Sequence, residues 1–190
     1  VAAIAAGVLI NTAGFLQSQA EATGQESTQQ VSNQLNTVST TAAVADIQDD
    51  SGANPITAVE TLTILTGIAP GSGDVDLEDI TIEYQGPDGT ATLTSGAVAN
   101  GNELAAAPDS SEFGLIKRSV DDGLGSEQFV LRENGDQIDI IVEFGSYDTG
   151  YGAIRPGESA QLTITTASGS QTTVDVSVPD TATSGETVRV

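Results

Sequence analysis

Carboxylates are the side chains through which this sequence could most readily do chemistry. The segment Asp74–Asp79 carries four of them, and Asp46–Asp50 carries three more. Oxygen-rich loops of this kind bind Ca²⁺ or Mg²⁺. Their spacing does not match the calcium loop of an EF-hand, however, and a chain with 27 acidic residues contains such clusters by chance. We therefore expect neither a specific metal site nor any other cofactor.

The residue types of the chain offer few of the side-chain combinations that enzymes use for catalysis. Two carboxylates could share acid–base work, as they do in glycosidases, but no pattern gathers a pair into an apolar cleft with aromatic side chains for a substrate. The chain has no histidine and no cysteine, which excludes Ser-His-Asp and thiolate catalysis and the usual zinc sites. Gly71-Ser72-Gly73 lacks the lysine of a phosphate-binding loop. The sequence is not expected to be an enzyme.

The charge balance restricts the partners. Against the 27 acidic residues stand 5 basic ones, for a net charge of -22, and Lys117 is the sole lysine. Nucleic acid binding requires a basic face, which this chain lacks, and anionic membrane surfaces are disfavoured for the same reason. Ordinary solubility would explain some acidity. We favour adaptation to molar salt, because lysine is nearly absent and salt at that concentration screens repulsion between carboxylates.

Most of the chain, from about Asn36, has the texture of an all-β domain. Strands are predicted within Val38–Ile47 and Val59–Leu65, at Val188–Val190, and in three hairpins. The first hairpin joins 79–84 to 90–94 through Gly86-Pro87-Asp88-Gly89; the second joins 129–132 to 138–144 through Asn134-Gly135; the third joins 160–166 to 172–178 through Ser168-Gly169-Ser170. Seven to nine such strands predict an immunoglobulin-like β-sandwich. Because aromatic residues make up 4% of the chain, its core must consist mainly of Val, Ile, Leu and Ala.

The first 35 residues have the pattern of one continuous helix. A stripe with steps of four and three runs along it, formed by Leu9, Ala13, Leu16, Ala20, Gly24, Ser27, Val31 and Leu35. Residues 1–16 are apolar on all sides, whereas 17–35 are polar on most sides. The helix is therefore expected to pass from a dry environment to a wet one.

The small residues of 1–16 favour close packing between helices, as in a membrane or a filament core. An ordinary membrane anchor and a secretory signal segment are the alternatives, the latter disfavoured because no small-residue cleavage site follows. Sixteen residues span about 24 Å, short of the ~20 residues that a bilayer crossing needs. Since the chain also contains no methionine, we expect further residues upstream of Val1.

These elements predict an α+β architecture: a long N-terminal hydrophobic α-helix over 1–36, followed by an immunoglobulin-like β-sandwich over 37–190. No second helix is predicted to cover the first. Its apolar part must be covered by other copies of the chain or by a membrane.

Several segments resemble one family. The N-terminal run is VAAIAAGVLINTAGFLQSQAEATGQESTQQVSNQL, and it is similar to the N-terminal helix of archaellins, the archaeal flagellins, particularly the haloarchaeal type. A looser similarity follows in VDLEDITIEYQGPDG, LRENGDQIDIIVEF and IRPGESAQLTITTASGSQTTVDVSVPD. The resemblance covers nearly the whole chain and is densest in the first 35 residues. It places the chain in the type IV pilin-like superfamily.

The resemblance implies a secreted subunit that lies transiently in the membrane and then polymerises with other archaellin subunits into an extracellular archaellum filament. The helices would form the filament core and the β-domains its sheath, and the archaellum motor and export machinery would be further partners. The residues expected to polymerise the helix are Val1, Ile4, Val8, Leu9, Ile10, Ala13, Phe15, Leu16, Ala20, Val31 and Leu35.

Two departures from the family pattern stand out. The family's helix normally begins further upstream, after a charged leader, and neither is in this sequence. Many members also carry N-glycans, yet none of the seven Asn residues lies in an Asn-x-Ser/Thr sequon. N-glycosylation at that motif is therefore not expected.

The expected function is that of a structural subunit for swimming motility. An archaeal adhesion pilin shares the same plan of helix and globular head and is the first alternative. A membrane-anchored extracellular binding domain that stays monomeric is the second.

Overall fold

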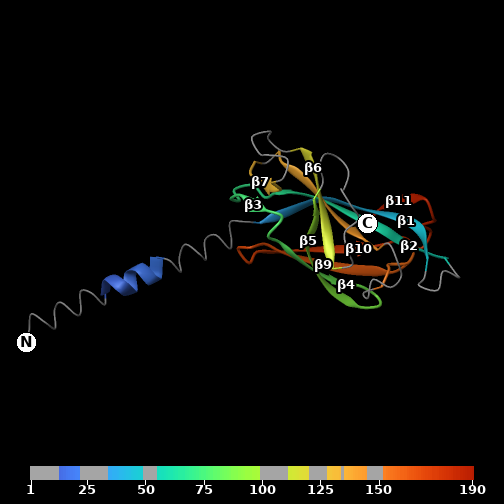
Figure 1. The fold of residues 1–190 in the computed structure, drawn as a ribbon, viewed down its shortest axis with the longest axis horizontal. Coiled ribbons are helices and arrows are strands. Elements are labelled where there is room, and N and C mark those ends of the chain that lie inside the picture. The colour runs from blue at the N-terminus through green and yellow to red at the C-terminus, as the bar shows by residue number, and fades with distance from the viewer. Residues whose placement is uncertain are drawn as a thin grey trace, which may run out of the picture.

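The structure, a computed structural model, describes residues 13–21, 34–48, 55–98, 111–119, 128–133, 135–144 and 152–190 (Figure 1). Residues 13–21 form a helix, and the other described ranges contain eleven strands. The described part of the chain is thus mostly β-sheet with one short helix.

The strands follow one another closely along the chain. They are β1 (Leu35–Gln48), β2 (Pro55–Ile68), β3 (Val75–Asp76), β4 (Thr81–Gln85), β5 (Thr90–Val98), β6 (Glu112–Ser119), β7 (Val130–Leu131), β8 (Gln137–Glu143), β9 (Ser159–Thr165), β10 (Gln171–Ser177) and β11 (Glu186–Arg189). Nine of them form one sheet in the order β10-β9-β4-β5-β6-β8-β2-β1-β11, while β3 and β7 form a two-stranded sheet. All pairs are antiparallel except β5–β6, which is parallel.

The large sheet curls so that its two halves enclose a single core. The hydroxyl of Thr172 on β10 donates a hydrogen bond of 3.1 Å to the carbonyl oxygen of Leu35 on β1, although β10 is the first strand of the sheet order and β1 the last but one. Inward side chains from both halves, such as Leu162 and Ile140, meet in one hydrophobic cluster. The cluster is mainly aliphatic, as predicted, and its largest members are Tyr84 and three phenylalanines.

Two of the three predicted hairpins are confirmed. Strands β4 and β5 pair across the turn that Gly86 and Gly89 close with a 2.9 Å backbone hydrogen bond. Strands β9 and β10 pair around Gly169, whose φ of 83° is a conformation that favours glycine. The predicted strands near 38–47, 59–65 and 188–190 lie in or overlap β1, β2 and β11.

The prediction that residues 129–132 pair with 138–144 is wrong. Strand β7 pairs with β3, and β8 instead pairs with β2 and β6. A turn does connect β7 to β8, and the Asp136 carboxylate holds it by accepting the backbone N–H groups of Arg132 at 2.8 Å and Glu133 at 3.1 Å. These hydrogen bonds to the Asp136 side chain stabilise the turn, in place of the backbone pairing between strands that a hairpin would have.

Candidate assembly surfaces

The helix at 13–21 exposes large apolar side chains. Phe15 is 69% exposed and Leu16 is 61% exposed. The helix is supported by its own polar contacts, since the Gln17 amide donates to the Glu21 carboxylate at 3.2 Å and the Ser18 hydroxyl donates to the Gly14 carbonyl at 3.1 Å. Figure 1 shows the helix lying apart from the β-domain. Adjacent exposed apolar side chains of this size mark a surface that another molecule covers.

Four of the predicted polymerisation residues lie on this helix, and all four are exposed: Ala13, Phe15, Leu16 and Ala20. Six others lie outside the described residues: Val1, Ile4, Val8, Leu9, Ile10 and Val31. Among the helical residues that the structure describes, none belongs to a segment long and apolar enough to span a bilayer.

The structure corrects the placement of Leu35. This residue begins strand β1 instead of ending a helix, and it is 5% exposed within the core of the β-domain. Its backbone pairs with Ile68 of β2, and its carbonyl accepts the Thr172 hydroxyl. Because both its side chain and its backbone are committed to the β-domain, Leu35 is not available to a helix bundle.

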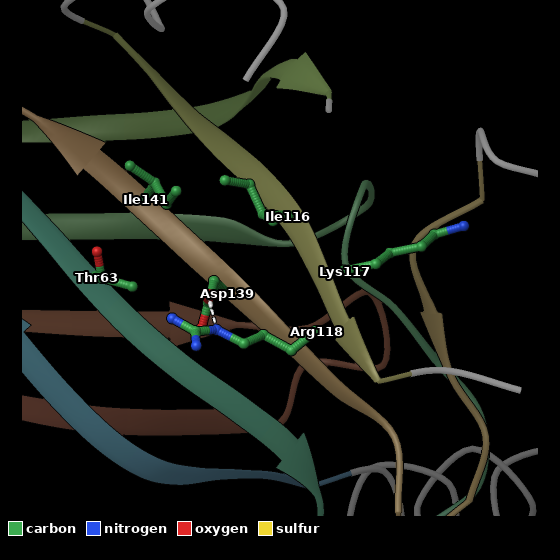
Figure 2. A pocket seen from close by; sticks show the side chains of 6 residues that line it. All are labelled: Thr63, Ile116, Lys117, Arg118, Asp139 and Ile141. Carbon is green, nitrogen blue, oxygen red and sulfur yellow. Dashed lines mark hydrogen bonds and ion pairs between the residues drawn. The ribbon is translucent and has the colours of Figure 1, made fainter. Parts of the chain in front are cut away.

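An ion pair joins β6 and β8 (Figure 2). It lies on the outer face of the sheet, because the alternate residues Ile138 and Ile140 of β8 pack into the core. The Nε of Arg118 on β6 donates to Oδ2 of Asp139 on β8 at 2.5 Å. The Asp139 side chain is 4% exposed, whereas that of Arg118 is 60% exposed. The other carboxylate oxygen, Oδ1, is buried without a hydrogen bond from the part of the chain that the structure describes.

A pocket of about 490 Å³ opens beside this pair, lined by Thr63, Ile116, Lys117, Arg118, Asp139 and Ile141. Figure 2 shows Arg118 reaching back over β8 to Asp139, while Lys117 points away from it. Lys117 instead places its ammonium 5.1 Å from the centre of the Phe129 ring. The sequence gives no signal for this site, because the alternation of apolar and polar residues at 137–140 is also typical of a strand whose Asp139 faces solvent.

Two carboxylates, Glu143 on β8 and Glu60 on β2, lie near each other at the end of β8. Between Val59 and Thr61 of β2, Glu60 is an extra residue that has no partner in the register with β1. Burial raises the pKa of Glu143 on β8, and the nearby Glu60 carboxylate raises it further. The folded chain therefore disfavours the ionised form of Glu143.

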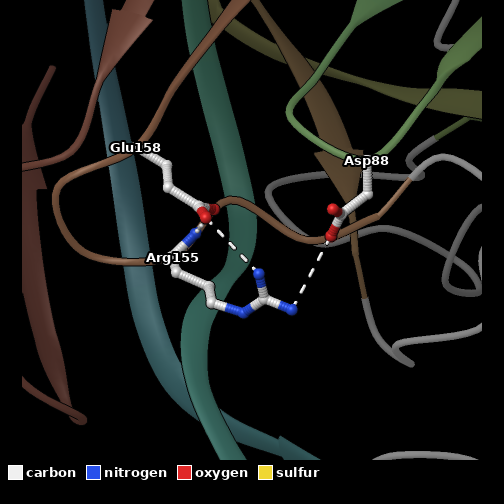
Figure 3. A network of polar contacts seen from close by, with 3 residues as sticks. All are labelled: Asp88, Arg155 and Glu158. Atoms are coloured by element: carbon white, nitrogen blue, oxygen red, sulfur yellow. Dashed lines mark hydrogen bonds and ion pairs between the residues drawn. The ribbon is translucent and has the colours of Figure 1, made fainter.

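An arginine ties two loops together at one end of the domain (Figure 3). The Arg155 guanidinium contacts Asp88 of the β4–β5 turn at 3.7 Å and Glu158 at 3.4 Å. The Glu158 carboxylate also accepts the Arg155 backbone N–H at 2.9 Å. Gly152 has a φ of 73°, and a Cβ built on it would collide with the Cβ of Asp88. This end of the domain therefore depends on both a charge network and a glycine.

The acidic segment near Asp74 forms turns and makes local contacts. The Asp76 carboxylate accepts the Glu78 backbone N–H at 3.0 Å, and Asp74 lies 3.8 Å from Arg132. Burial raises the pKa of Glu78, with further contributions from Asp76 and Asp79. Within the described ranges, no three His, Cys, Asp or Glu side chains come together in a way that could hold a metal ion.

Comparison with known proteins places these features in a family. A sequence model described as archaeal-type flagellin matches residues 1–176. Flagellin B1 of Natrialba magadii is 38% identical over 187 residues, covering 95% of this chain and 82% of the relative. Flagellin B2 of Halobacterium salinarum is 38% identical over 181 residues, covering 95% of this chain and 81% of the relative.

Solved structures agree on the fold. The crystal structure of the archaeal flagellin FlaB1 from Methanocaldococcus jannaschii superimposes with a TM-score of 0.63 at 15% identity, covering 82% of this chain and 94% of that one. The archaeal flagellum of Methanospirillum hungatei strain JF1 gives a TM-score of 0.62 at 16% identity, covering 97% of this chain and 89% of that one. The chain belongs to the archaeal-type flagellin family.

Proposed function

We propose that this chain is a structural subunit of an archaellum, a cell-surface filament outside the cell that drives swimming. The single observation that carries the proposal is the helix at 13–21, whose Phe15 and Leu16 side chains are mostly exposed, whereas the described strands bury a core of their own. Burial of such side chains between subunits would supply cohesion, since apolar surface removed from water contributes about 25 cal/mol per Å². Membership of the flagellin family supports the same role. The role is structural and needs no catalysis.

We further propose that the described helix is part of a longer one that ends before β1 begins at Leu35, and that the strands from Leu35 onward form an immunoglobulin-like sandwich. The apolar sequence of 1–16 supports the long helix. Two curled halves of one mainly antiparallel sheet around one core support the sandwich. The helices would form the filament core and the β-domains its outer sheath.

The remaining partners follow from this plan. The apolar helix would lie transiently in the membrane before the subunit polymerises with its copies. The export machinery would then extract the subunit, and the archaellum motor would rotate the finished filament. The acidic surface, with a net charge of -22, would keep such a filament dispersed in brine.

The proposal is tested by deleting the gene in its host and restoring it as wild type, as Leu16→Asp or as Gln19→Asp. Leu16→Asp puts a charge on the exposed apolar turn, whereas Gln19→Asp puts the same charge on an exposed position of the same helix that is already polar. We expect wild type and Gln19→Asp to restore swimming and the filaments seen by electron microscopy, and Leu16→Asp to restore neither.

Other results would reject the role. Normal swimming in the deletion strain, with loss of a second filament type or of surface attachment, would instead indicate an adhesion pilin. A Leu16→Asp strain that swims as well as wild type would remove the helix from the assembly mechanism.

A further inference from the structure

The five basic side chains of this acidic protein are not spread evenly. Arg132 lies near Asp74, Arg155 contacts Asp88 and Glu158, and Lys117 lies over a phenylalanine ring. The two remaining basic residues, Arg118 and Arg189, are exposed and lie on the same side of the sheet. Arg118 is bonded to a buried carboxylate through Nε alone, and Arg189 makes no ion pair with any residue that the structure describes.

Both arginines belong to the outer side of the half-sheet β6-β8-β2-β1-β11. Residues paired across its strands form a row that runs Arg189, Thr41, Thr63, Ile141 and Gly114. The alternation of the strands places this row opposite the core, because Val188, Ala42, Leu62, Ile140 and Leu115 pack inward. None of the five residues in the row is acidic.

The neighbouring row continues the same surface. It runs Ser39, Leu65, Asp139 and Ile116, with Arg118 beside it. Its one acid, Asp139, is 4% exposed and paired with Arg118, so it adds little negative charge to the surface. The next row on the same side runs Thr187, Ala43, Thr61 and Glu143, so one acid borders this surface. We call the first two rows, with Arg118, the low-charge face.

The other half of the sheet presents a different outer side. Its corresponding rows are Glu83, Thr163 and Thr173, and Gln85, Gln161 and Asp175. Each of these two rows contains one acid and no base, and a third row, Thr81, Thr165 and Gln171, contains neither. The two outer sides therefore differ mainly in their bases and apolar residues: Arg118 and Arg189 lie on one side together with isoleucine and leucine, whereas the paired rows of the other side carry hydroxyls, amides and two acids.

We propose that the low-charge face is the surface by which the β-domain docks on a second copy of the chain. Charge complementarity favours this occupant: a copy carries 27 acidic residues, which suit Arg189 and the exposed edge of Arg118. A surface that combines apolar side chains with two exposed arginines lets two copies of so acidic a chain approach with less repulsion than an acidic surface would.

A pocket of about 490 Å³ lies on this face, beside the pair of Arg118 and Asp139. Asp139 is buried within the single chain, so the surface that the pocket offers to a second copy comes from its other lining residues. Side chains of the second copy would enter this pocket, where Ile116 and Ile141 would pack against their apolar atoms.

The inference rests on the proposed function and is tested with one substitution at two matched positions. Thr63 on β2 and Thr163 on β9 are both half-buried, both point outward, and both lie on strands that have neighbours on each side. Thr63→Glu adds a carboxylate to the low-charge face, and Thr163→Glu adds the same carboxylate to the outer side of the other half of the sheet. Full-length chains are expressed in the deletion strain, and the filament sheared from the cells is weighed and imaged.

We expect Thr63→Glu to lower the filament yield about tenfold or more, because its carboxylate would be buried at each contact and would compete for the arginines that receive the acids of the second copy, and Thr163→Glu to leave it near wild type. Equal thermal midpoints of the two variants in molar salt would show that both β-domains fold. Equal yields from the two variants, whether high or low, would overturn the inference. A wild-type chain that forms no filament would instead reject the proposed function.

Discussion

Arg118 Nε lies 2.5 Å from Asp139 Oδ2, in a pair whose two partners differ sharply in exposure. The carboxylate is almost fully buried on the outer face of β8, while more than half of the guanidinium side chain is in water. A charge that is buried depends on its partner far more than a charge that is exposed. The two ends of this ion pair should therefore respond differently to mutation.

Arg118→Gln is expected to destabilise the fold by about 2 kcal/mol, because Asp139 would remain buried without its cation. Asp139→Asn should cost less, because the amide oxygen still accepts from Nε and the freed arginine is solvated. Thermal unfolding of both variants in the same molar salt measures the difference. Equal losses, or a larger loss for Asp139→Asn, would contradict the assignment of Asp139 as the dependent partner.

Gly152 and Gly185 separate two costs of replacing a glycine. Their φ values are 73° and 85°, so an alanine is strained at either position. Around Gly185 a new Cβ meets no atom within 4 Å, whereas at Gly152 it collides with Asp88. We expect Gly185→Ala to cost about 1 kcal/mol from backbone strain and Gly152→Ala distinctly more. Equilibrium unfolding of the two variants gives the comparison, and equal costs would mean that the Asp88 turn moves aside freely.

The local β-signals in the sequence were sufficient to place most strands. Alternation at 80–84 and the turn from Gly86 to Gly89 predict β4 and β5 correctly. Both signals are local, because the face on which a strand residue lies and the conformation of a turn depend on residues close together in the sequence. Val174 and Val176 likewise identify the buried side of β10. These elements follow from interactions within a few residues.

Pairings between distant segments could not be predicted in the same way. Phe129–Leu131 looked like a partner for the following strand, yet β7 pairs with β3, which lies about fifty residues earlier in the chain. The parallel pair β5–β6 and the extra residue Glu60 in β2 also lack a local signal. The candidate docking face was missed for this reason, since it arises only when β6, β8, β2, β1 and β11 lie side by side.

Glu143 gives a prediction for pH. Its pKa is raised above the ordinary 4.5 in the folded chain, by burial and then by Glu60. Protonation therefore stabilises the fold, and this contribution is full below the unfolded pKa and is lost as the pH rises through the folded value. Glu143→Gln should thus be more stable than wild type at pH 7, by up to roughly 1 kcal/mol after solvent screening, with the gain shrinking toward pH 4.

The exposed Glu83 on β4 provides the matched control for this measurement. Glu83→Gln also removes one negative charge, so any general relief of repulsion between carboxylates appears in both variants. Thermal midpoints at several pH values isolate the local effect as the difference between them. The same gain in both variants at every pH would rule out a special cost at Glu143.

The net charge of -22 predicts a strong response to salt. The Debye length falls from ~10 Å at 0.1 M to ~3 Å at 1 M, so repulsion between surface carboxylates is largely screened only at high salt. We expect the thermal midpoint of the β-domain to rise steeply between these concentrations, and assembled filaments to come apart on dilution. Screening depends on ionic strength, whereas exclusion of salt from the surface depends on the anion. Chloride and sulfate at equal ionic strength should therefore give similar midpoints if repulsion dominates. A thermal midpoint that is unchanged by chloride but rises with sulfate would assign the salt response to burial of apolar surface instead of to the acidic side chains.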